Sequence, residues 1–125
     1  SSSAVLKDSI PEINKYDLPI FPGGPLQSEV DGWKQNFPGS KVFVIELSDV
    51  MYVYRTLNRH EYKQIVSFQT DALTREEMIC NTCTLWPQNF GYKIMANGKA
   101  GTPSTFASII MESSGFTKQY KVIEL

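Results

Sequence analysis

The sequence predicts a small single α+β domain in which a β-hairpin packs against about three helices, with an extended, proline-rich N-terminal arm before it. Two β-rich runs, 41–47 and 50–57, are separated by only two residues, which is the spacing of a hairpin. Segments with helix-capping patterns follow the hairpin, whereas residues 1–27 hold four prolines that interrupt regular structure. We therefore expect an arm at 1–27 and an α+β domain at 28–125.

Length and composition limit the class of protein. The chain has 125 residues and is 42% hydrophobic, which suits one domain with a real core. Its 12 basic and 13 acidic residues give a formal charge of −1, so there is no electrostatic case for binding nucleic acid or an anionic membrane. No apolar run approaches the roughly 18–20 residues of a membrane span. The first residues do not resemble a signal peptide and two cysteines are not a secreted disulfide framework, so we expect intracellular synthesis.

The arm is too apolar for a free disordered tail. It carries Ile20, Phe21 and Leu26 among other large apolar residues, which a solvated tail would not favour. We expect it to lie in a groove, either on its own domain or on a neighbouring subunit. Ser28 then has the position and chemistry to cap a short helix through residue 36, and Trp33 falls inside that helix.

The hairpin runs directly into a capped helix. Ser48-Asp49 joins its two strands, and Asn58 is followed three residues later by Glu61, which is the pattern of a capping box before a helix at 59–68. Arg55 lies late in the second strand, just before that helix. Its guanidinium is expected to pair with Glu61 or Glu77 inside the chain, or to contact a partner protein.

Two more helices are expected after this one. Thr74 is the predicted cap of a helix from Arg75 to about Leu85, before the Trp86-Pro87 pair. Thr102 is the predicted cap of a last helix, with Pro103 at its favoured first position. Gly115 is expected to stop that helix.

The cysteines are the one candidate for chemistry. Cys80 and Cys83 are three residues apart, but they lie inside a predicted helix and not at its start, where a thiol would be activated. His60 is the single histidine, and nothing in the sequence places it beside them. We expect buried, inert cysteines, no catalytic residue, no metal and no cofactor. A thiol-redox or metal-binding protein using Cys80 and Cys83 remains the alternative.

The aromatic content favours an interaction protein. The chain has seven Phe, six Tyr and two Trp, and several of them fall at element ends or in loops, where exposed rings anchor partners. The interface candidates are Ile20, Phe21, Leu26, Trp33, Arg55, Tyr62, Trp86 and Phe90.

The run from Tyr52 to Ile65 resembles small proteins of contractile-tailed bacteriophages that take part in tail and baseplate assembly, namely tail-assembly chaperone-like and baseplate-hub assembly proteins. An aromatic-x-Arg-x-Leu-like phrase before a capped helix with Glu-Tyr carries the resemblance, at Arg55, Leu57, Glu61 and Tyr62. Shorter phrases at 76–87 and 100–116 look like the later helices of that group, so the likeness covers residues 50–116.

The resemblance implies a non-enzymatic structural or assembly protein of a phage tail or baseplate. Its partners would be other tail or baseplate proteins in a multi-subunit assembly, with no nucleic acid and no membrane. It would be found in the virion, or in the host cytoplasm during assembly. A host-directed accessory binding protein is a further alternative.

Overall fold

The chain forms two compact units, 1–38 and 39–125. The computed structural model describes residues 17–88, 98–116 and 121–125. The boundary after Pro38 is later than the expected one after residue 27, because the helix that follows the arm groups with the arm. The described elements are α2 (Gln27–Asn36), β1 (Val42–Leu47), β2 (Val50–Arg55), α3 (Arg59–Ser67), α4 (Ala72–Cys83), β3 (Thr84–Trp86) and α6 (Thr102–Ser113). Helices and an antiparallel sheet confirm the α+β class.

In the first unit, the described part of the arm contains a tight turn that the sequence analysis did not predict. The backbone N–H of Gly24 donates to the carbonyl of Phe21 at 2.9 Å. Pro22 follows Phe21, and Gly23 has a φ of 77°. Proline followed by a positive-φ glycine is the signature of a type II turn. Two further backbone hydrogen bonds close a loop around the turn, from Ile20 to Pro25 and from Gln27 to Leu18. Residues 1–16 of the arm lie outside the described residues.

Helix α2 begins earlier than predicted, and the prediction that Ser28 caps it is wrong. Leu26 occupies the N-cap position, so Ser28 lies in the first turn. The carboxylate of Asp17 accepts hydrogen bonds from the backbone N–H of Ser28 at 2.8 Å and from its hydroxyl at 2.6 Å. Glu29 accepts from the N–H of Leu26 at 3.0 Å. Negative carboxylates suit the positive end of the helix dipole, and they replace the missing side-chain cap.

In the second unit, the predicted hairpin is present. Strands β1 and β2 are antiparallel, and Phe43 pairs with Tyr54 across the hairpin. Ser48 and Asp49 have φ values of 50° and 66°, so they form a two-residue turn with both residues in the left-handed region, as in a type I′ turn. The short strand β3 pairs with β2 on its other side, which gives the order β1-β2-β3.

Helix α3 begins as predicted, whereas the predicted cap of α4 is wrong. The side chain of Asn58 accepts from the N–H of Glu61 at 2.8 Å, and the Glu61 carboxylate accepts from the N–H of Asn58 at 3.1 Å. For α4, Asp71 is the N-cap, and its carboxylate accepts from the N–H of Thr74 at 2.7 Å. Thr74 is therefore the partner of the cap. A carboxylate three residues upstream was available, and it is the better acceptor.

The ends of α4 and α6 also differ from the predictions. Helix α4 stops at Cys83 because Thr84 is extended and begins β3, so the helix does not reach Leu85. Gly101 holds the N-cap position of α6, and Thr102 is its first residue rather than its cap. The stop at Gly115 is confirmed by a φ of 97°. The second unit therefore holds the expected hairpin and three described helices.

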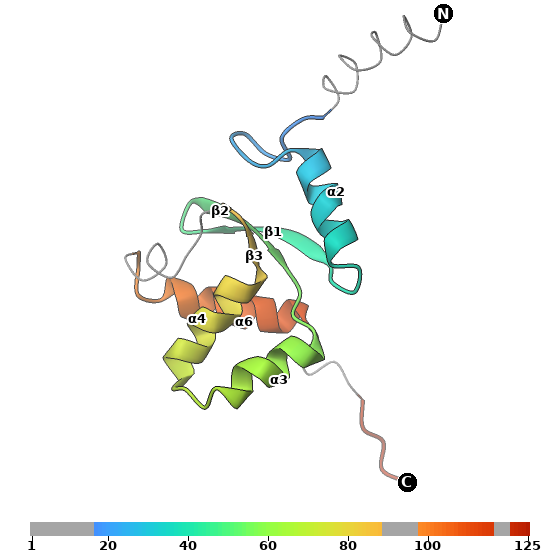
Figure 1. Ribbon diagram of the computed structural model, residues 1–125. Helices are drawn as coiled ribbons and strands as arrows, with labels where there is room; N and C mark the ends of the chain where they lie inside the picture. The colour runs from blue at the N-terminus through green and yellow to red at the C-terminus, as the bar shows by residue number, and fades with distance from the viewer. Residues whose placement is uncertain (1–16, 89–97, 117–120) are drawn as a thin grey trace, which may run out of the picture. The chain divides into compact units, whose positions relative to one another are not determined.

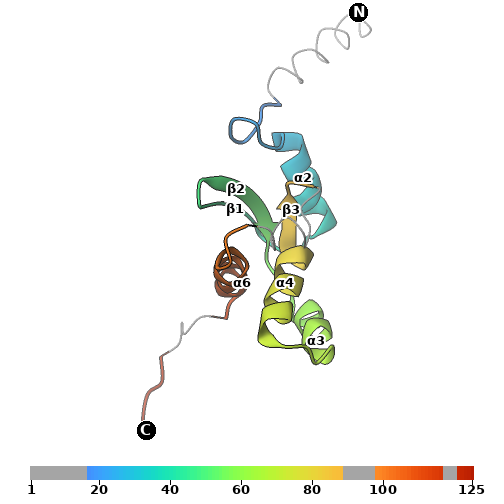
Figure 2. The ribbon, with the colours of Figure 1, turned by 90° about the vertical axis from the view of Figure 1, so that its left-hand side faces the viewer.

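One core joins the hairpin to helices α4 and α6, which lie side by side (Figures 1 and 2). Phe106 of α6 is fully buried, and its ring centroid lies 5.2 Å from that of Tyr52 and 5.6 Å from that of Tyr54. The other buried members of this core are Leu57, Ile65, Ile79, Cys80, Cys83, Ala107 and Ile110. Each large apolar side chain buried here stabilises the fold by roughly 1.5–3 kcal/mol.

Candidate interaction site

Arg55 lies at the meeting point of β2, α3 and α4. Its guanidinium donates two hydrogen bonds to the Glu61 carboxylate, at 2.9 and 2.7 Å. It also donates to the carbonyl of Thr82 at 3.1 Å, in the last turn of α4, and to the carbonyl of Thr56 at 3.2 Å. Arg55 is only 5% exposed. We call these four residues the Arg55 junction.

The junction settles the choice that the sequence left open for Arg55. Its hydrogen bond to Glu61 is the main reason why the pKa of that carboxyl is lowered. A planar guanidinium that meets a carboxylate with two parallel hydrogen bonds is a strong and specific pair. Glu61 is the internal partner, and the guanidinium is engaged inside the chain and not at the surface. Arg55 therefore holds three elements together.

The end of α6 is tied to the same region. The hydroxyls of Tyr54 and Ser113 are hydrogen bonded at 2.7 Å, and the backbone N–H of Leu57 donates to the Ser114 hydroxyl at 2.8 Å. The ring of Phe116 lies with its centroid 4.7 Å from that of Tyr62. These contacts bring residues 52–65 together with the end of the segment 100–116. The segments 52–65 and 100–116 thus contribute to the fold.

The two cysteines are buried, and burial disfavours their thiolate forms. Both are free, and neither is exposed. Burial raises the pKa of Cys80 to about 12 and, likewise, that of Cys83 to about 12. The thiolate is the nucleophile and the metal ligand, so these thiols are poor in both roles near neutral pH. Within residues 17–88, 98–116 and 121–125, no group of three or more metal-ligating side chains comes together.

The remaining interface candidates are distributed over both units. In the first unit, Ile20, Phe21 and Trp33 are half-buried, whereas Leu26 is exposed. In the second unit, Tyr62 on α3 and Trp86 on β3 are half-buried. Phe90 lies outside the described residues. His60 is exposed on α3.

One face of α3 forms a shallow hollow of about 270 Å³, which we call the α3 surface. It is lined by Arg59, Tyr62, Lys63, Val66 and Ser67. These residues recur at the three- and four-residue spacing that places side chains on one side of a helix. The Arg59 guanidinium carbon lies 5.9 Å from the centre of the Tyr62 ring, and Val66 is 37% exposed. The α3 surface therefore combines an aromatic ring and an apolar side chain with two positive charges.

The turn between α3 and α4 exposes two large apolar side chains. Phe68 is 64% exposed and Leu73 is 67% exposed, and we call the pair the α3–α4 corner. Between them, Gln69 has a φ of 50°, which ends α3 in the left-handed conformation. Sequence reasoning missed both residues, because an apolar residue near a helix end is expected to pack inward. The corner continues the α3 surface along the chain.

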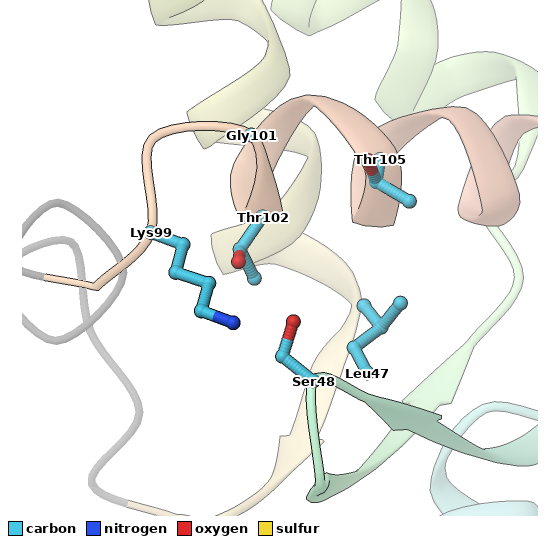
Figure 3. A pocket seen from close by; sticks show the side chains of 6 residues that line it. All are labelled: Leu47, Ser48, Lys99, Gly101, Thr102 and Thr105. Carbon is cyan, nitrogen blue, oxygen red and sulfur yellow. The ribbon is translucent and has the colours of Figure 1, made fainter.

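A second hollow lies where the hairpin turn meets the start of α6 (Figure 3). It has a volume of about 260 Å³ and is lined by Leu47, Ser48, Lys99, Gly101, Thr102 and Thr105. Figure 3 shows the Lys99 ammonium group and the hydroxyls of Ser48 and Thr102 directed toward the same space. Lys99 and Ser48 are exposed, so the polar groups of this hollow are open to solvent and none of them is held in a buried site.

Comparison with protein-family models, curated proteins and solved structures finds no match. No helix among the described residues has the length and apolar character to span a membrane. The described residues form a small α+β domain in which the Arg55–Glu61 pair and the two thiols lie in the interior, and whose surface carries apolar and basic side chains.

Proposed function

We propose that this protein is a non-enzymatic assembly protein that acts through protein–protein contacts. The observation that supports this most is which side chains are buried and which are exposed. The Arg55 junction and the two thiols lie in the interior, whereas the large apolar side chains of Phe68 and Leu73 are exposed. Exposed large apolar side chains beside a polar rim are typical of partner-binding surfaces.

The α3 surface and the α3–α4 corner are the proposed contact sites. A partner suited to them would place an apolar anchor against Tyr62 and Val66, and acidic side chains near Arg59 and Lys63. Aromatic and apolar anchors supply most of the affinity in such contacts, and rim charges mainly guide association. A basic rim next to apolar groups therefore favours an acidic, amphipathic segment of another protein.

The assembly that we propose is the tail or baseplate of a contractile-tailed bacteriophage. Its support is the resemblance of residues 50–116 to proteins that assemble those structures. Three of the residues that carry that resemblance are engaged within the fold. Arg55 and Leu57 are buried, and Glu61 is hydrogen bonded to Arg55. The resemblance therefore bears on the fold, and the contacts would come from the surface residues named above. The proposed location is the virion, or the host cytoplasm during assembly.

Mass spectrometry of purified particles and of infected cells tests this proposal. If the protein is a tail or baseplate component, its peptides will be present at stoichiometric level in virions of the phage that encodes it. If it is an assembly chaperone, it will be absent from virions and will co-purify with unassembled tail proteins from infected cells. Expression without either association would contradict the proposal.

A further inference from the structure

The C-terminal residues repeat part of β1. Val122-Ile123-Glu124-Leu125 is identical, residue for residue, to Val44-Ile45-Glu46-Leu47. In the first copy these residues form most of a strand. In the second copy they belong to no helix or strand, and Val122 and Ile123 are 81% and 69% exposed. A sequence that is compatible with this sheet is therefore presented outside it.

The outer edge of β1 offers a place for such a strand. The carbonyl of Lys41 accepts from the N–H of Thr56, so the backbone of Lys41 points toward β2. Alternate residues of an antiparallel strand point their backbone groups to opposite sides. The backbone groups of Val42, Val44 and Glu46 therefore face away from β2. Strand β1 is an edge of the described sheet and has six residues, whereas β3 at the other edge has three.

We propose that residues 121–125 of one copy add to β1 of a second copy as an antiparallel strand. This inference rests on the proposed assembly function and names one of its partners as the chain itself. Parallel alignment of the repeated residues would set Glu124 opposite Glu46, and like charges directly opposite each other are destabilising. The antiparallel arrangement avoids that contact. Strand addition of this kind supplies main-chain hydrogen bonds and leaves side chains to select the partner.

The pattern of apolar side chains selects which residues of 121–125 lie opposite which residues of β1. When Ile123 lies opposite Ile45, Leu125 lies opposite Phe43 on the same face. The ring of Phe43 is 38% exposed at the edge of the sheet, stacked on Tyr54 with 5.6 Å between centroids. Leu125 would extend this apolar row. Val122 would lie on the opposite face of the sheet, beside Glu46.

The length of the chain favours a second copy over the same molecule. In this register the added strand begins beside Leu47, at the hairpin turn. The end of α6 is tied to the other end of the hairpin, where Ser114 accepts from the N–H of Leu57. From Phe116 to Lys121 the chain spans at most about 17 Å, at roughly 3.4 Å for each extended residue. To pair with β1 of its own molecule, the chain would first have to run back along nearly the whole hairpin, which is about 20 Å for six residues. That distance is longer than the segment can span.

Sedimentation velocity of the full chain over a range of concentrations tests the proposal. The unaltered chain is expected to self-associate reversibly, as a closed dimer or as a head-to-tail series. Ile123→Ser should weaken association at least about tenfold, because it removes an apolar side chain from the paired face. Val122→Ser is the matched control, since it removes a similar side chain from the opposite face, and it should change association less than about threefold.

A mixing experiment tests the two halves of the contact separately. Val44→Pro removes an outward N–H from the edge of β1 while leaving the ladder to β2 intact, a position where edge strands tolerate proline. Chains with Val44→Pro and chains with Ile123→Ser should each be monomeric. Their mixture should form a heterodimer with one junction, because the first supplies an intact segment and the second an intact edge.

Two results would overturn the inference: an unaltered chain that stays monomeric at all concentrations, or an effect of Val122→Ser as large as that of Ile123→Ser. If the Val44→Pro chain does not fold, the comparison of Ile123→Ser with Val122→Ser still tests the inference, because those two residues lie outside the core. A chain that self-associates but joins no phage assembly would remove the proposed function alone. A monomeric chain found in virions would remove only this inference.

Discussion

The Arg55 junction and the α3–α4 corner lie near opposite ends of helix α3 and use their side chains in opposite ways. At the junction, the charges of Arg55 and Glu61 are largely buried and hydrogen bonded. At the corner, the apolar side chains of Phe68 and Leu73 are mostly exposed. Each region reverses the usual rule that charged groups face water and apolar groups face the core.

The contrast separates stability from recognition. A buried ion pair costs desolvation energy, and removing one partner leaves the other charge uncompensated. An exposed apolar side chain contributes little to folding, so the fold does not account for its presence. We therefore expect substitutions at the junction to act on stability, and substitutions at the corner to act on partner binding.

Arg55→Ala is expected to have the largest effect. It removes both hydrogen bonds to Glu61 and the one to the Thr82 carbonyl. Breaking a buried pair in this way should lower the free energy of unfolding by about 3 kcal/mol. Chemical denaturation measures the loss. Arg55→Lys is the control, since it keeps the charge but loses the two-point contact, and it should lose less. Equal stability of all three proteins would contradict a structural role for the junction.

Acid should weaken the junction without any substitution. The pKa of Glu61 is lowered in the folded protein, chiefly by its hydrogen bond from Arg55. The ionised carboxylate therefore stabilises the fold above its ordinary pKa of 4.5, and this contribution is lost as the pH falls through the lowered folded value. Denaturation midpoints of the unaltered chain should fall more steeply below pH 4.5 than those of Glu61→Gln. Parallel curves would show that Glu61 is not linked to folding.

The helix caps should have smaller effects that differ between α3 and α4. Asn58→Ala removes the acceptor of the Glu61 N–H and should cost about 1 kcal/mol of unfolding free energy. Asp71→Ala should also lower stability, since it removes the acceptor of the Thr74 N–H. Thr74→Ala keeps that backbone donor and its acceptor, so it should be the mildest of the three. A larger loss for Thr74→Ala than for Asp71→Ala would reverse the assigned cap.

The sequence predicted those parts of the fold that depend on neighbours in the chain. The hairpin, the Asn58–Glu61 capping box and the stop at Gly115 are all set by contacts within a few residues. Two acceptors compete near the start of α4, and pattern alone did not show that Asp71 and not Thr74 provides the cap. The support of α2 by Asp17 could not be predicted, because the two groups are separated by 11 positions.

The candidate site was harder to predict because exposure is decided by the whole fold. Tyr62 and Arg55 were both interface candidates; Tyr62 lines the α3 surface, whereas Arg55 is buried. Phe68 and Leu73 are large apolar residues of the kind that usually lie in a core. They are exposed because of the path that the chain takes through Gln69. The repeated Val-Ile-Glu-Leu is visible in the sequence. It suggests strand addition only once β1 is known to be an edge strand.

The corner should show the smallest change in stability and the clearest change in binding. Phe68→Ser with Leu73→Ser removes two large side chains that are mostly in water, so the free energy of unfolding should move by less than about 0.5 kcal/mol. Co-purification of tail or baseplate proteins from infected cells should be lost, because the exposed anchors are gone. Val50→Ser is the matched control, since Val50 is 46% exposed but lies on the hairpin. Binding that survives the double substitution, or that Val50→Ser removes equally, would mean that the corner is not the contact site and that its exposed side chains need another explanation.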